Sequence, residues 1–208
     1  MKAVMKIQNH YFKKVYTPFN QPLLTSNGTM GGNSFAVSGS TSGGDVNGAP
    51  WQAFATEKGY SGSLYYVYVK GGRPSIYLNM YTPKPTVITG YSVFLPQYKG
   101  FWGRGTNNIL YGSNTNGNWE QINFQAYIAN NTQNVITFEN QKVYKYYRFQ
   151  TTCEGGNGRD GISLSSFRLI GNECTDVEVA EGEEYDYIIK EKKFKTILNK
   201  QNFYGIKL

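Results

Sequence analysis

The chain is poor in the side chains that most enzymes and metal proteins depend on. Its 208 residues include one histidine, His10, and two cysteines, Cys153 and Cys174. One histidine with no nucleophile motif near it gives no Ser-His-Asp or Cys-His arrangement, so nucleophilic catalysis is not expected. Two cysteines are too few for a disulfide framework and lack zinc-type spacing. Free thiols are favoured, although one Cys153–Cys174 pair stays open.

Charge and long apolar runs are also scarce. Charged residues make up 17% of the chain, and no run of about 18 apolar residues exists, so no membrane span is expected. The start of the chain has no apolar stretch of the signal-peptide kind, so secretion by that route is not expected. The net charge of +7 is scattered rather than gathered in a stripe, which argues against a nucleic-acid partner.

Carboxylates are few before residue 173. The segment from 21 to 172 holds six of them, and none forms a motif of paired acids. A glycan-active enzyme would need such a pair, so it is the weakest of the functions considered. The glycine-rich pieces lie between expected strands rather than before helices, which excludes phosphate-binding loops of the common kinds. We therefore expect a protein that is not an enzyme and that needs no cofactor.

What the chain has in abundance is glycine, tyrosine and phenylalanine, with 24, 18 and 12 residues. Apolar and polar residues alternate in several short segments, as half-buried strands require. In residues 75–81, for example, Ile76, Leu78 and Met80 share one face, and Tyr77, Asn79 and Tyr81 share the other. This pattern predicts an all-β sandwich of the jelly-roll kind. Strands are expected at residues 64–69, 75–81, 87–95, 134–140, 144–151 and 162–170.

Two of these strands contain an expected irregularity. Gly90 lies inside the strand at 87–95, where glycine marks a bulge or a kink. Between Leu164 and Phe167 the alternation changes parity, which predicts a bulge at Ser165 and Ser166.

Composition divides the chain into three parts. Residues 1–20 form a basic aromatic arm with net charge +4, residues 21–172 form the β domain with +5, and residues 173–208 form a tail with −2. The tail is rich in aromatic and aliphatic residues, so we expect it to dock on a neighbouring subunit in a homo-oligomer or larger assembly, and a short amphipathic helix is expected over 190–200. A solvated tail is the open alternative.

One glycine-flanked segment is the main candidate for binding. Phe101, Trp102 and Arg104 lie close together there, and a segment of this kind cannot bury two large rings by strand packing. Exposed rings stack on sugars, and a neighbouring Arg donates to hydroxyls. The alternative is that Trp102 caps the sandwich core. Arg159 and Asp160 are further ligand candidates in another loop; with Asp45, Asn47 and Glu154 they could also contact Ca²⁺, although turn stabilisation is the commoner role of such residues.

The order of several segments resembles the discoidin-like domains, also called F5/8 type C or family-32-like carbohydrate-binding modules. "APWQAF" resembles the family's Ala-Trp-x-Ala-Phe motif, and "YGSNTNGNWEQI" resembles its Ser-Asn-Asp-Gly turn followed by Trp. The segments that resemble the family in order are 22–43, 49–54, 87–94, 109–122, 144–152 and 161–171.

This resemblance implies a galactose-binding-like sandwich over residues 21–172 and a sugar site in the loop that holds Phe101, Trp102 and Arg104. The chain also departs from the family pattern: the usual Asp-Gly is Ala55-Thr56, and the usual Glu of the last strand is Ser166. The turn's Asp is replaced by Thr115-Asn116. These differences weaken the implied calcium or sugar contacts.

The glycine- and serine-rich segment at 24–40 also resembles such domains in bacteriophage tail and virion proteins. The resemblance implies a virion protein that is made in the host cytoplasm and helps attach the particle to host-surface glycans. Residues 1–20 and 173–208 would then contact other virion proteins. A structural assembly or decoration protein without sugar binding is the alternative.

The turn in residues 111–122 is interpreted as architecture. Asn and Gly residues favour the positive-φ positions that connect two strands. Trp119, which follows the turn, is expected to pack into the sandwich core.

Overall fold

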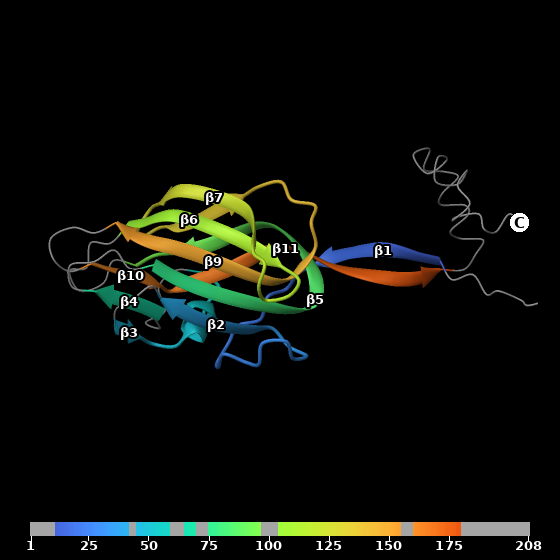
Figure 1. Ribbon diagram of the computed structural model, residues 1–208, viewed down its shortest axis with the longest axis horizontal. Helices are drawn as coiled ribbons and strands as arrows, with labels where there is room; N and C mark the ends of the chain where they lie inside the picture. The colour runs from blue at the N-terminus through green and yellow to red at the C-terminus, as the bar shows by residue number, and fades with distance from the viewer. Residues whose placement is uncertain are drawn as a thin grey trace, which may run out of the picture. The chain divides into compact units, whose positions relative to one another are not determined.

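The computed structural model describes residues 11–41, 45–58, 65–69, 75–96, 104–154 and 160–179 (Figure 1). The chain divides into two compact units. One is Thr17–Cys174, and the other combines Met1–Tyr16 with Thr175–Leu208. The larger unit is an all-β sandwich whose strand pairs of defined register are antiparallel, so the fold class expected from the sequence is confirmed.

Two layers form the sandwich, and strand β5 (Ser75–Phe94) belongs to both. In the front layer, the first half of β5 pairs with β2 (Ala36–Thr41) on one side and with β9 (Tyr144–Glu154) on the other. The layer continues from β9 to β6 (Arg104–Ser113) and from β6 to β7 (Glu120–Ile128). The back layer pairs the second half of β5 with β11 (Ser166–Val179) and β8 (Gln133–Thr137). Figure 1 shows β5 curving from one layer into the other.

Beside these layers lies a small sheet of three strands, in the order β10 (Asp160–Leu164), β4 (Tyr65–Val69) and β3 (Asp45–Asn47). A 3-10 helix, η1 (Pro50–Phe54), carries buried Ala53 and Phe54 into the core. Its first turn is closed by Gln52, whose Oε1 accepts a hydrogen bond of 2.6 Å from the Ala49 N–H. Among the described residues, no helix is long and apolar enough to cross a membrane.

The bend of β5 lies between Tyr81 and Thr86, where the pairing with β9 shifts register. The bend contains Pro83 and Pro85, which cannot donate to a ladder and therefore suit this gap. Buried hydroxyls hold it together: Thr86 Oγ1 lies 3.2 Å from Thr82 Oγ1, and the Tyr147 hydroxyl donates to the Thr86 carbonyl at 2.6 Å. One strand thus links both layers through a polar but hydrogen-bonded corner.

The core lies between the layers and confirms the expected alternation in residues 75–81. Ile76, Leu78 and Met80 are fully buried. Within the back layer, the rings of Tyr91 on β5 and Phe167 on β11 stack with centroids 5.6 Å apart and planes 13° apart. Stacked and tilted rings of this kind add to the free energy gained from burying apolar area.

The two expected irregularities have different outcomes. At Ser165 the chain changes sheets, since β10 pairs with β4 and β11 pairs with β5, so the single bulged strand expected over 162–170 is wrong. The strand breaks at Ser165 because its two halves pair with β4 and β5, which belong to different sheets. Near Gly90 the expectation holds: the register of β11 against β5 shifts between Ile170 and Gly171, opposite Gly90 and Ile88.

Strand β1 (Tyr11–Pro18) lies in the expected basic arm and is a hydrogen-bonded neighbour of β11. Cys174 of β11 has a free, buried thiol. The boundaries expected at residues 20 and 172, and the docking of the tail on another subunit, stay predictions. The helix expected over 190–200 lies outside the described residues.

Candidate functional site

Strand register places the strand ends that flank the candidate ligand segments at one end of the front layer. Arg104, the first residue of β6, is paired with Glu154, the last residue of β9. Ser75, the first residue of β5, pairs with Thr152 of β9 at the same end. The segment before β6 and the segment after β9 therefore join the front layer at neighbouring positions.

The five predicted ligand residues belong to these segments. Arg104 begins β6, and Asp160 begins β10, where its backbone pairs with Val69. Phe101, Trp102 and Arg159 lie outside the described residues. The part played by each of these side chains stays a prediction.

The small sheet places two of the carboxylate residues on either side of β4. Asp45 of β3 pairs with Tyr68, and Gly161, which follows Asp160, pairs with the same residue from the opposite side. Within the described ranges, however, no group of three or more His, Cys, Asp or Glu side chains could hold a metal ion. The calcium contacts considered for Asp45 and Asp160 stay a prediction.

The outer face of the front layer holds a second cluster of polar and aromatic side chains. Asn79, Arg148 and Tyr111 are paired in register across β5, β9 and β6, pointing away from the core because their chain neighbours Leu78, Phe149 and Leu110 are buried in it. Arg148 Nε donates a hydrogen bond of 2.7 Å to Asn79 Oδ1. Asn79 Nδ2 donates in turn to Ser38 Oγ of β2 at 3.2 Å. One polar row thus crosses four strands.

Trp119 belongs to this outer face, so the expectation that it packs into the core is wrong. Its ring centroid lies 4.3 Å from the Arg148 guanidinium carbon. The reason is a register shift: Leu110 pairs with Asn123, but Tyr111 pairs with Gln121, so Ile122 is an extra residue in β7. An extra residue inverts the alternation of side chains, and this inversion carries Trp119 outward. In the turn, Asn116 has a positive φ of 54, as expected, whereas Gly117 does not have a positive φ.

Two tyrosines flank the Arg148 guanidinium. The Tyr77 ring centroid lies 5.8 Å from its carbon, and the Tyr111 hydroxyl donates to Gln150 Oε1 at 3.4 Å. Partial burial raises the pKa of Tyr111, and partial burial lowers the pKa of Arg148. A cation-π contact of this kind strengthens when water is partly excluded. The cluster is therefore a half-buried cation surrounded by rings and neutral polar groups.

Sequence reasoning did not identify this cluster as a site. The available signal was the alternation that places Tyr77 and Asn79 opposite the buried face of β5. Arg148 joins them only through strand pairing, 69 positions further along the chain. Such pairing cannot be found from local pattern.

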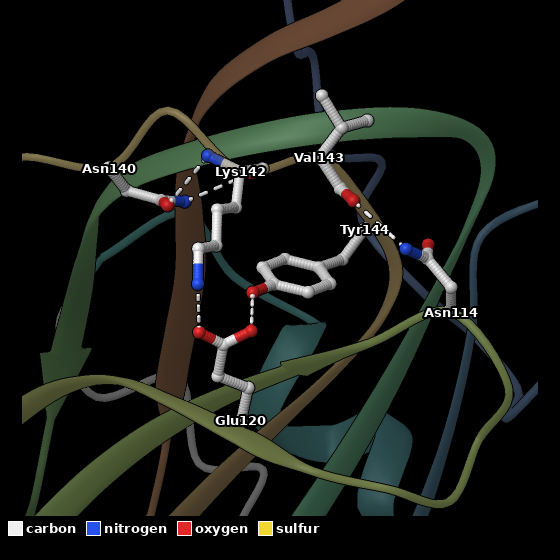
Figure 2. A network of polar contacts seen from close by, with 6 residues as sticks. All are labelled: Asn114, Glu120, Asn140, Lys142, Val143 and Tyr144. Atoms are coloured by element: carbon white, nitrogen blue, oxygen red, sulfur yellow. Dashed lines mark hydrogen bonds and ion pairs between the residues drawn. The ribbon is translucent and has the colours of Figure 1, made fainter.

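A third polar network lies where the turn after β6 meets the segment before β9 (Figure 2). The Glu120 carboxylate forms an ion pair with Lys142 and accepts a hydrogen bond of 2.7 Å from the Tyr144 hydroxyl. Asn114 Nδ2 donates to the Val143 carbonyl at 3.2 Å. Hydrogen bonds from Lys142 and Tyr144 lower the pKa of Glu120, and burial together with Glu120 raises the pKa of Tyr144 to about 12. This network links the turn after β6 to the segment before β9, and both oxygens of its carboxylate, that of Glu120, have partners.

No protein-family model matches the chain, and no curated protein matches it. Several solved structures are similar to it. CpGH89CBM32-5 from Clostridium perfringens, in complex with GalNAc-β-1,3-galactose, is 13% identical with a TM-score of 0.48, covering 65% of this chain and 94% of that one. The family 32 carbohydrate-binding module of C. perfringens NanJ, in complex with galactose, is 14% identical with a TM-score of 0.46, covering 64% and 93%.

A chitosan-binding module from a chitosanase/glucanase of Paenibacillus sp. IK-5 is 19% identical with a TM-score of 0.47, covering 64% of this chain and 93% of that one. At such identities and TM-scores, these similarities carry no argument about what this chain binds.

Proposed function

We propose that this chain is a non-enzymatic carbohydrate-binding domain. The observation that carries the proposal is the strand register at the end of the front layer where β6 begins and β9 ends, the loop end, at which Arg104 of β6 is paired with Glu154 of β9. The aromatic segment precedes Arg104 in the chain, and the segment that leads to Asp160 follows Glu154, so the strand ends next to both segments are paired. Rings beside a few polar groups suit sugars, which present apolar ring faces and hydroxyls together. The order of discoidin-like motifs in the sequence supports the same function.

We further propose that the domain works on a bacteriophage particle, in a tail or other surface position, and contributes to attachment to host-surface glycans. The support is the resemblance of residues 24–40 to segments of phage virion proteins. Residues 1–20 and 173–208 would contact neighbouring virion proteins or further copies of the chain. Particle proteins of this kind are made in the host cytoplasm.

A structural assembly or decoration protein is the second candidate. It is favoured by the division of the chain, since Met1–Tyr16 and Thr175–Leu208 form a compact unit of their own. Deleting residues 175–208 and measuring incorporation into particles would separate the roles. An assembly role predicts loss of incorporation, whereas a purely sugar-binding role predicts that glycan binding by the truncated protein is unchanged.

The sugar-binding proposal is tested with a glycan array and with whole host cells. Truncating a central aromatic anchor costs about 2 kcal/mol or more, roughly a thirtyfold loss of affinity. We therefore expect Trp102→Ala to lose binding to that extent. Tyr16→Ala is the matched control, because Tyr16 is an aromatic residue that is 52% exposed in the smaller unit. Equal binding by wild type and Trp102→Ala, or binding by neither, contradicts a sugar site at the loop end.

A further inference from the structure

We propose that the outer face of the front layer is a second binding surface, for a carboxylate-bearing polysaccharide that is held by Arg148. This surface is separate from the loop end, because Asn79, Arg148 and Tyr111 lie within strands rather than at their ends. It goes beyond the proposed function, since it names another face of the sandwich and another class of ligand.

The first argument is the unused hydrogen-bonding capacity of Arg148. Its Nε donates to Asn79, while Nη1 and Nη2 donate to none of the described residues. Arg168, a second half-buried arginine among the described side chains, provides the contrast. Its Nη1 donates to the Pro22 carbonyl at 3.1 Å, and its Nη2 donates to the Gln21 carbonyl. Arg168 is satisfied by the fold, whereas Arg148 retains the pair of donors that matches a carboxylate.

The second argument is the missing counter-charge. The described ion pairs join Lys84 to Glu173 and Lys142 to Glu120, and neither involves Arg148. Glu120 follows Trp119 directly, but its carboxylate is directed to Lys142 and Tyr144 (Figure 2). Partial burial disfavours the charge of Arg148, and no described carboxylate offsets this. An acidic ligand would supply the absent charge.

The third argument is the shape and chemistry of the surrounding face. The Trp119 ring covers Arg148 at 4.3 Å, and Tyr77 lies beside it at 5.8 Å. Tyr111 and Gln150 add a hydroxyl and an amide. The row from Ser38 to Tyr111 crosses four strands, roughly 15 Å at the usual strand spacing. A flat row with rings and hydrogen-bonding groups suits an extended polymer better than a single sugar.

The test uses polygalacturonate and alginate as polyuronate probes, with fully methyl-esterified polygalacturonate as the neutral form of the same polymer. Binding is measured by isothermal titration calorimetry at low and moderate salt. We expect the wild type to bind the polyuronates and to bind the esterified polymer at least tenfold more weakly. Arg148→Gln should lose roughly tenfold or more in affinity, the usual worth of a charge-assisted contact.

Lys58→Gln is the matched control. It removes the same charge from an exposed position beside Glu57, whose carbonyl accepts a hydrogen bond from Ser166 of the back layer. Lys58→Gln and Trp102→Ala should both retain polyuronate binding, and the second result separates this surface from the loop end. Thermal unfolding checks that Arg148→Gln folds. If it does not, Tyr77→Ala, which leaves the cation in place, is expected to weaken polyuronate binding.

Three results overturn the proposal. The first is absence of polyuronate binding by the wild type. The second is equal binding of the esterified polymer, or an equal loss in Lys58→Gln, which would indicate diffuse attraction to a basic protein. The third is unchanged affinity in folded Arg148→Gln or, where that variant does not fold, in Tyr77→Ala.

Discussion

Gln21 offers a pH-dependent test of how the edge of β11 is closed. Its side chain is buried, with 5% exposed. Nε2 donates to the Phe167 carbonyl at 2.9 Å, and Oε1 accepts from the Leu169 N–H at 2.8 Å. The side-chain amide of Gln21 therefore forms the two backbone hydrogen bonds that a neighbouring strand would otherwise form with β11. The variant Gln21→Glu keeps the shape but, when ionised, has no donor for the Phe167 carbonyl.

The expected size of the effect follows from these two contacts. An unsatisfied buried acceptor costs about 1–3 kcal/mol, and the adjacent buried charge adds to it. A total of about 3 kcal/mol corresponds to a carboxyl pKa raised by about two units from 4.3. Below pH 4 the protonated carboxyl can donate to the Phe167 carbonyl again. Because the folded pKa is raised, the variant should match the wild type below about pH 4 and lose stability as the pH rises through about 6.5.

The assay is thermal unfolding of wild type, Gln21→Glu and Gln21→Ala at pH 4 and pH 8. At pH 8 we expect Tm of Gln21→Glu to be about 6–12 °C below that of the wild type, from about 2–4 °C per kcal/mol for a chain of this size. Most of this difference should vanish at pH 4. Gln21→Ala loses both contacts at either pH, so its deficit should be constant. An equal deficit of Gln21→Glu at both pH values, or none at pH 8, would refute the reasoning.

Three further predictions concern the rest of the sandwich. The partners of Glu120 in Figure 2 lower its pKa from 4.5. The network's contribution to the free energy of unfolding is therefore present above pH 4.5 and is lost as the pH falls through the lower folded pKa. Glu120→Gln should remove this part of the acid dependence, measured by urea unfolding. A Cβ at Gly171 would lie 2.1 Å from the Val87 carbonyl oxygen, so Gly171→Ala should lower the free energy of unfolding by about 3 kcal/mol or more, or should not fold. At Gly117 the nearest atom to such a Cβ is 3.7 Å away, so Gly117→Ala should change the free energy of unfolding by less than about 0.5 kcal/mol. The buried Tyr91 hydroxyl has no partner among the described residues, so Tyr91→Phe should leave Tm unchanged or raise it, and a clear loss would reveal a partner such as a buried water.

Local pattern predicts the fold class because burial follows the alternation of side chains. Ile76, Leu78 and Met80 are buried as their spacing requires. Pattern fails where a single residue changes the register. Ile122 moves Trp119 from the expected core to the outer face, and nothing in the order of residues marks Ile122 as extra.

The candidate sites divide along the same line. The loop-end residues could be proposed from composition, because rings and Arg in a glycine-flanked segment are visible in the sequence. The contact of Arg148 with Asn79 depends on which strands become neighbours, and that is decided by the packing of the whole sandwich. That no carboxylate of the described residues pairs with Arg148 also becomes visible only in three dimensions.

Strand β5 has a consequence for how the protein is made. Its four neighbours, β2, β8, β9 and β11, come from positions as far apart as Ala36 and Glu173. Contacts between distant positions slow folding, because each long loop must close before its contacts form. During synthesis, the edge of β5 that pairs with β11 therefore stays unpaired until β11 has left the ribosome. A chain that stops before β11 would expose that edge to other unfinished chains, and aggregation rather than a partial domain is the expected product.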